Sequence, residues 1–191
     1  MHVTSIDGST SPGRTTADQR GRQALMRVYR LLRKVPGCEN LRVDFAATEC
    51  GVRETWRIVG EKFVDYAAYT SGRVWPDAVC YSFYPIDVHR HDDNTIDTRP
   101  LNRGVVPTIP YGALVPKGSD HLLAAGRCIS GDAEASSAYR VQASAMATGQ
   151  AAGAAAAIAA KKGISVRAVD LTELRAVLRA NRAIVPELAV P

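Results

Sequence analysis

The feature that most constrains the fold of this 191-residue chain is a long uncharged segment toward its carboxy end. Residues 143–160 are mostly Ala and Gly, and they lie inside a helical pattern that runs from Arg140 to about Lys162 and stops at Gly163. Gly often follows the last turn of a helix, because it adopts a positive φ without strain. The hydrophobicity of the segment is too low for a convincing membrane span. We therefore expect a tightly packed interior helix.

Local patterns predict two further helices. Apolar residues at steps of three and four predict a helix over residues 16–35, after a turn-forming loop at residues 7–14. A last helix is expected from Leu171 to about Asn181. Asp170 and Glu173 form a pair resembling a capping box at its start.

Alternating or continuous apolar runs predict the strands and the loops between them. We expect two strands within 41–59, further strands within 74–88, extended structure with turns over 105–116, a buried strand at 121–125, an exposed polar loop at 90–103 and a small-residue loop at 130–137.

Composition indicates a globular protein, because 46% of the residues are apolar and 23% are charged. The net charge of +5 comes from scattered basic residues, which favours a solvated surface over a nucleic-acid interface. The amino-terminal residues lack the pattern of a signal peptide, so we expect a cytoplasmic protein without a membrane partner. None of the four cysteines forms a C-x-x-C pair, which predicts reduced thiols and neither zinc nor an iron–sulfur cluster.

The start of the long helix is the candidate site that follows from the residues alone. The first turn of a helix has free N–H groups and a partial positive charge, and Arg140 would add a full charge there. Gly149 and Gly153 lie on one helix face and would let a backbone or a flat ligand approach closely. The alternative is an ordinary packed helix whose start binds nothing.

Several ordered runs also carry a resemblance to a known family. They are residues 51–60 (GVRETWRIVG), 84–89 (YPIDVH), 109–117 (IPYGALVPK), 122–130 (LLAAGRCIS), 140–142 (RVQ) and 146–153 (MATGQAAG). These runs are similar to the carboxy-terminal part of FAD-dependent oxidoreductases with a glutathione-reductase-like FAD fold. The nearest branch is the one grouped with the FAD subunit of heterodisulfide reductase, and the resemblance covers about residues 2–180.

The resemblance implies a mixed α/β protein with part of an FAD/NAD(P)-binding fold. Residues 1–108 would form a β-rich region on the substrate side, with one early helix. Residues 109–165 would complete the FAD-binding domain, and residues 166–191 would form a terminal helix and tail.

The resemblance also implies roles for individual residues. Those expected at the FAD cofactor are Gly126, Arg127, Arg140, Val141, Gln142, Gly149, Gln150 and Gly153. Glu54, Arg57 and Asp87 would face the flavin ring from the substrate side, with His89 and Arg53 as the first candidates for substrate contact or proton transfer. The alternative for these last five residues is an ordinary salt-bridged sheet surface.

One departure from the family pattern is plain. Full-length members have a G-x-G-x-x-G loop in a βαβ unit that holds the pyrophosphate, and no G-x-G occurs in this sequence. We therefore expect that the sequence is the carboxy-terminal part of such an enzyme, and that an amino-terminal FAD-binding half, possibly a separate chain, is missing from it.

The function expected from these features is flavin-mediated hydride or electron transfer on an unidentified small-molecule substrate. One alternative is a non-catalytic flavin-binding or docking half of a split enzyme. Another is a metal-dependent hydrolase that uses His89 and His91, but a complete ligand set is not found in the sequence, so we expect no metal.

Overall fold

The computed structural model describes residues 3–90 and 95–187. Helices and short antiparallel strands make up these ranges, so the mixed α/β class expected from the sequence is confirmed. No helix within the described ranges is long and apolar enough to cross a membrane. The contacts divide the chain into two compact units, each of which is described by itself.

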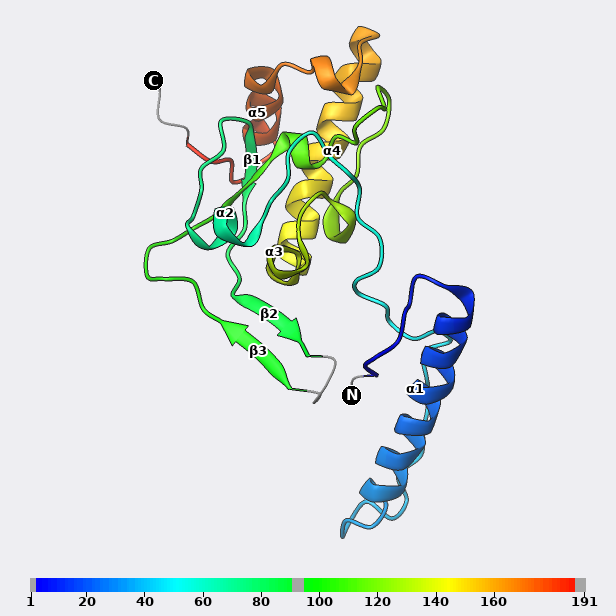
Figure 1. Ribbon diagram of the computed structural model, residues 1–191. Helices are drawn as coiled ribbons and strands as arrows, with labels where there is room; N and C mark the ends of the chain where they lie inside the picture. Colours follow the sequence, from blue (N-terminus) through cyan, green and yellow to red (C-terminus); the bar gives the residue numbers. More distant parts are fainter. Residues whose placement is uncertain (1–2, 91–94, 188–191) are drawn as a thin grey trace. The chain divides into compact units, whose positions relative to one another are not determined.

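The first compact unit comprises residues 1–55 and 89–95, and its main element is helix α1, Ser11–Leu32 (Figure 1). The helix predicted over 16–35 is thus confirmed for most of its length. It begins earlier than predicted, so the loop expected at 7–14 is wrong in its second half.

The early start of α1 has a local cause. The Thr10 side chain caps the helix by accepting a hydrogen bond from the backbone N–H of Gly13 at 3.2 Å. Pro12 stands in the first turn, where its missing N–H costs no intrahelical hydrogen bond. A cap and a proline together therefore override the turn-forming composition of this stretch.

The two strands predicted within residues 41–59 are wrong. The structure contains no strand there, and the side chains of Leu41 and Phe45 are 38% and 79% exposed. A strand forms when a neighbouring strand accepts its ladder of hydrogen bonds, and this segment has none in the described residues. Its backbone is held to α1 instead, where the N–H of Cys50 donates to Asp18 Oδ1 at 2.6 Å.

The second compact unit comprises residues 56–88 and 96–191. Its centre is an antiparallel ladder of strands β1 (Ala78–Tyr81) and β4 (Thr108–Pro110), which are almost completely buried. The strand-rich stretch predicted from residue 74 is confirmed for β1, and the extended structure predicted from residue 105 is confirmed for β4.

The register of this ladder places Cys80 opposite Ile109 and Tyr81 opposite Thr108, with an irregularity between Ala78 and Cys80. Short helix α2 (Tyr66–Thr70) precedes the ladder in the chain. The ladder and the surrounding apolar side chains form the main hydrophobic core of the unit.

A second, separate ladder pairs β2 (Ile86–His89) with β3 (Ile96–Arg99). The exposed loop expected over residues 90–103 is therefore wrong at β3. A polar strand is compatible with this sequence, because alternate residues of β3 remain exposed to solvent. The residues between the strands, 91–94, lie outside the described part of the chain.

Helix α4, Gln142–Lys162, confirms the long small-residue helix, and Gly163 ends it with a φ of 63° as predicted. Its buried face includes Ala151 and Ala155, which are both 0% exposed. This face packs against β1 and against helix α5, Leu171–Ala180 (Figure 1). Small side chains let the three backbones lie close together.

The predicted start of α5 is also confirmed. Asp170 caps the helix by accepting hydrogen bonds from the N–H groups of Thr172 at 2.6 Å and Glu173 at 3.2 Å. The hydrogen bond from Glu173, followed by that from Thr172, lowers the pKa of the Asp170 carboxyl. Leu174 and Leu178 form the buried stripe of the helix.

The buried strand predicted at residues 121–125 is wrong. These residues lack the ladder partner of a strand, and Leu122 is 56% exposed. The N–H of Ala124 donates to the carbonyl of Leu114 at 2.8 Å, so the segment remains attached to the core. A continuous apolar run indicates burial only where another layer covers it.

The small-residue loop predicted at 130–137 is wrong as well, because helix α3 (Ala133–Tyr139) occupies most of it. Asp132 explains the helix. One carboxylate oxygen accepts from the N–H of Ala135 and the other from the N–H of Tyr66, both at 2.7 Å. A single side chain therefore caps α3 and ties it to the start of α2.

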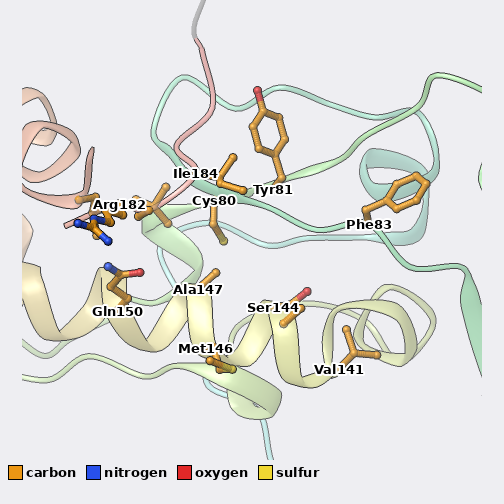
Figure 2. A pocket seen from close by; sticks show the side chains of 14 residues that line it. Cys80, Tyr81, Phe83, Val141, Ser144, Met146, Ala147, Gln150, Arg182 and Ile184 are labelled. Atoms are coloured by element: carbon orange, nitrogen blue, oxygen red, sulfur yellow. The ribbon is translucent and has the colours of Figure 1, made fainter. Parts of the chain in front are cut away.

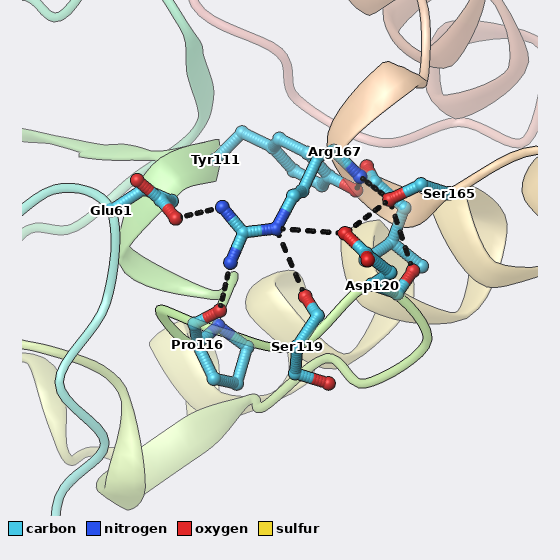
Figure 3. Close-up of polar contacts among 8 residues, drawn as sticks. Glu61, Tyr111, Pro116, Ser119, Asp120, Ser165 and Arg167 are labelled. Carbon is cyan, nitrogen blue, oxygen red and sulfur yellow. Dashed lines mark hydrogen bonds and ion pairs between the residues drawn. The ribbon is translucent and has the colours of Figure 1, made fainter.

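Three 3₁₀ turns complete the second unit: η1 (Tyr111–Ala113), η2 (Gly126–Cys128) and η3 (Val166–Ala168). Arg167 in η3 is the main polar connection of this region (Figure 3). Its guanidinium donates to the carbonyls of Pro116 at 2.9 Å and Ser119 at 3.1 Å and forms ion pairs with Glu61 and Asp120. It thereby joins three separate segments of the chain.

Replacing Arg167 with Ala should lower the free energy of unfolding by about 1–2 kcal/mol, because two backbone carbonyls lose a charged donor. Urea denaturation of the purified chain measures this change. Arg179→Ala, at an exposed position of α5, is the matched control and should stay within about 0.5 kcal/mol. Equal stability of the two variants would contradict the connecting role of Arg167.

Candidate functional site

The candidate site is a groove of about 660 Å³ in the second unit (Figure 2). Its size lies in the range of small-molecule sites. The walls come from β1 and the residues after it, from the first half of α4, and from the segment after α5. Labelled lining residues are Cys80, Tyr81, Phe83, Val141, Ser144, Met146, Ala147, Gln150, Arg182 and Ile184.

The start of α4 opens at this groove. Val141 is the N-cap residue, and no side chain makes a capping hydrogen bond there. The N–H groups of the first turn have no intrahelical acceptors, and the helix dipole adds partial positive charge. Val141 and Ala143 of this turn line the groove, so the helix start lies at a mostly apolar wall that also includes Gln150 and Arg182.

A chain of buried hydroxyl groups leads from the core to the groove. Tyr69 Oη lies 3.0 Å from Ser82 Oγ, which lies 2.9 Å from Ser144 Oγ in the first turn of α4. Tyr69 Oη also donates to the carbonyl of Tyr84 at 3.1 Å. Burial raises the pKa of the Tyr69 phenol, so it keeps its proton.

Arg140, expected beside the flavin ring, and Asp87, expected on the substrate side, are in contact. The Arg140 guanidinium donates to the Asp87 carbonyl at 2.8 Å and lies 4.0 Å from its carboxylate. The side chain of Arg140 is only 7% exposed. The N–H of Asp87 donates to Ser137 Oγ at 3.0 Å, so strand β2 is fastened to α3 at this point.

Gly126 packs against α4 beside Ala145 and Thr148. Its N–H donates to Thr148 Oγ1 at 3.0 Å, and its φ of 73° favours glycine. Ala145 lies next to it, one turn after Val141 on the same face of the helix. Arg127 follows at an exposed position of η2.

Gly149 and Gly153 do not make the close packing expected of them within the described chain. A Cβ atom built on either residue would meet nothing within 4 Å. Gln142 is exposed on the same face, and Met146 is 75% exposed. Gln150 lies at the groove, where its side-chain amide donates to the Asn181 carbonyl at 3.3 Å.

The residues expected on the substrate side are divided between the two units. Arg53, Glu54 and His89 belong to the first unit, while Arg57 and Asp87 belong to the second. Arg53 and Glu54 are exposed, and the other three are half-buried. Their roles in substrate contact stay predictions.

The described residues include no group of three or more His, Cys, Asp or Glu side chains that could hold a metal ion. All four cysteines are free thiols. His91, the second ligand of the metal hypothesis, lies outside the described residues.

Comparison with known proteins identifies the family. A model of the family described as FAD dependent oxidoreductase matches residues 1–178. The chain belongs to this family of FAD dependent oxidoreductases. A search of curated proteins and a search of solved structures each gave no match. The general resemblance seen in the sequence is thus confirmed at the level of the family.

The groove fits the ring system of the cofactor that the family name implies. It has apolar walls for a flat aromatic ring, and it contains the uncapped first turn of α4 and the hydroxyl of Ser144. A flavin supplies hydride or electron transfer when bound, and the protein orients and tunes it. Val141, Ser144, Ala147 and Gln150 are the residues of α4 that would hold the ring.

Sequence reasoning missed the chain of buried hydroxyl groups that ends at Ser144 in the groove wall. Tyr69, Ser82 and Ser144 come from three distant parts of the chain, and no spacing connects them. The one available signal was Ser144 itself, a hydroxyl one turn into a helix of small apolar residues.

Replacing a glycine with alanine should have opposite effects at an exposed helix position and at a tightly packed position of this unit. Gly153→Ala should raise the free energy of unfolding by about 0.5–1 kcal/mol, because it removes a helix-interior glycine and the new Cβ meets open space. Gly131→Ala should lower it by about 1–3 kcal/mol, because its Cβ would lie 2.6 Å from the Val64 carbonyl and against the Tyr139 hydroxyl. Thermal unfolding measures both, and a destabilised Gly153→Ala variant would show that the α4 face is already covered.

The buried thiol of Cys80, at the groove, predicts that the stability of the fold depends on pH. Burial raises the pKa of Cys80 from 9.0 to about 12, so the folded chain holds this proton more tightly than the unfolded chain. This contribution to stability is complete below pH 9.0 and is lost as the pH rises toward about 12. Urea unfolding between pH 8 and 11 should therefore show a shallower decline in Cys80→Ala than in the unaltered chain. Equal slopes would contradict the burial of the thiol.

Proposed function

We propose that the groove at the start of α4 holds the isoalloxazine ring of FAD, and that the chain takes part in flavin-mediated hydride or electron transfer on a small-molecule substrate. The observation that carries this proposal is the uncapped helix start beside an apolar groove of about 660 Å³. Family membership supports the cofactor.

The helix start suits the charge that a flavin gains at its N1–C2=O edge on reduction. The free N–H groups and the helix dipole of α4 favour negative charge there. Arg140 stands just before the N-cap, but its guanidinium is bonded to Asp87. We therefore assign Arg140 to fastening β2 near the ring.

The remaining cofactor contacts are proposed to come partly from outside these 191 residues. No G-x-G loop is available in the sequence to hold the pyrophosphate. Another segment or chain would supply that loop and the adenosine contacts. Gly126 and Arg127 would lie on the route from the ring to the phosphates, where Gly126 packs beside Ala145 and Thr148 of α4.

The substrate side is proposed from the resemblance. His89 and Arg53 would contact the substrate or move a proton, and Glu54, Arg57 and Asp87 would line the same side. The runs at 51–60 and 84–89 support placement in the branch grouped with the heterodisulfide reductase FAD subunit.

A docking role is the second candidate, and one observation favours it. Gly149 and Gly153 face open space on a helix surface whose small residues permit another backbone to approach closely. The amino-terminal FAD-binding half is the proposed occupant of that face. In that case the chain would contribute to the flavin site without catalysing a reaction alone.

Riboflavin titration tests the ring site directly, because it does not depend on adenosine contacts. Ala147→Phe places a large side chain in the groove and should weaken binding by at least about tenfold, measured by quenching of flavin fluorescence. Ala156→Phe, at an exposed position of the same helix, should bind like the unaltered chain. No binding by the unaltered chain, or equal binding by both variants, would contradict the proposed ring site.

A further inference from the structure

The hydroxyl chain that ends in the groove has a fixed direction. Each hydroxyl carries one proton, and a carbonyl only accepts hydrogen bonds. The Tyr69 hydroxyl donates its proton to the carbonyl of Tyr84 at 3.1 Å. In the 3.0 Å contact between Tyr69 and Ser82, Ser82 must therefore be the donor and Tyr69 the acceptor. Because the Ser82 proton is donated to Tyr69, Ser144 must be the donor in the 2.9 Å contact between Ser144 and Ser82.

The burial of the three side chains protects this direction. Tyr69, Ser82 and Ser144 are 1%, 2% and 3% exposed, so bulk water does not offer them other partners. If one of these hydroxyls pointed its proton in the other direction, a buried polar group would lose its hydrogen bond, which costs about 1–3 kcal/mol of stability. Ser144 Oγ is thereby left with lone pairs only.

The first turn of α4 therefore presents one acceptor beside several donors. Ser144 lines the groove, and the N–H groups of the same turn are uncapped. A donor–acceptor–donor arrangement complements a cyclic imide, whose N–H lies between two carbonyls. The pyrimidine edge of a flavin ring is such an imide, with N3–H between C4=O and C2=O.

We propose that Ser144 is the specificity-determining residue of the groove, and that it accepts a hydrogen bond from the imide N–H of the ring. Ser82 and Tyr69 are positioning residues that keep the Ser144 proton turned away from the ligand. This inference rests on the proposed function, because it takes the ring of a flavin as the occupant. Uridine carries the same imide edge but lacks the tricyclic ring that a groove of about 660 Å³ accommodates.

The test compares riboflavin with 3-methylriboflavin, whose imide N–H is replaced by a methyl group. Fluorescence quenching gives the Kd of each ligand for the full chain. The unaltered chain should prefer riboflavin by about tenfold, the effect of one hydrogen bond to a buried acceptor. Ser144→Ala should reduce the preference to about twofold or less, because the acceptor is gone and the methyl group gains space.

Three further variants separate the proton direction from general packing. Tyr69→Phe keeps Ser144 in place but frees the Ser82 proton to point toward it, so the preference should fall. Ser144→Thr retains the acceptor and should keep the preference, which carries the test if Ser144→Ala does not fold. Ser130→Ala is the matched control, because Ser130 is 1% exposed and its hydroxyl has no hydrogen-bond partner among the described residues.

The outcomes distinguish this inference from the proposed function. Equal affinity of the unaltered chain for the two flavins overturns the role of Ser144 and leaves the ring site intact. A preference retained in Ser144→Ala has the same consequence. Failure of the unaltered chain to bind riboflavin overturns the proposed function as well. Competition by uridine at the affinity of riboflavin would assign the groove to pyrimidine nucleosides instead.

Discussion

The packing of α4 against strand β1 is the interaction on which the second unit depends. Ala151 and Ala155 are fully buried at this contact, and their size sets how closely helix and strand approach. Two turns before Ala151 on the same face, Ser144 reaches Ser82 just beyond β1. A larger residue at Ala151 would move the helix away from the strand and separate these hydroxyls. The core contact and the polar end of the groove are therefore one structural feature.

The elements that were predicted correctly are those whose signals are local. The extent of α4, its end at Gly163 and the cap of α5 by Asp170 depend on residues within one or two helical turns. Helix periodicity and capping operate at this range. Two of the wrong predictions concern segments whose state depends on a distant partner: the runs at 41–59 and 121–125 have apolar patterns but no neighbouring strand in the described chain. The loops predicted at 7–14 and 130–137 were wrong for a local reason, because the caps supplied by Thr10 and Asp132 begin helices there.

The candidate site was predictable to the same extent. The start of α4, with Val141 and Gln150, was found from sequence and lies at the groove. The contact between Arg140 and Asp87 was not predictable, because it joins residues 53 positions apart in sequence through the pairing of β2 with α3. The sequence pattern identified the helix end that lies at the groove, but the fold determined which side chains accompany it.

The contact of Arg140 with Asp87 changes the electrostatics expected at the groove. A free guanidinium before the N-cap would attract any anion, including phosphate and carboxylate groups. With that charge bonded to a carbonyl and near a carboxylate, the positive charge at the groove comes from Arg182 in its wall and from the helix dipole and uncapped N–H groups of α4. In the proposed orientation Ser144 would add a hydrogen-bond acceptor beside these donors. Such a wall would suit a ligand edge with alternating carbonyl and N–H groups, as an oxidised flavin has.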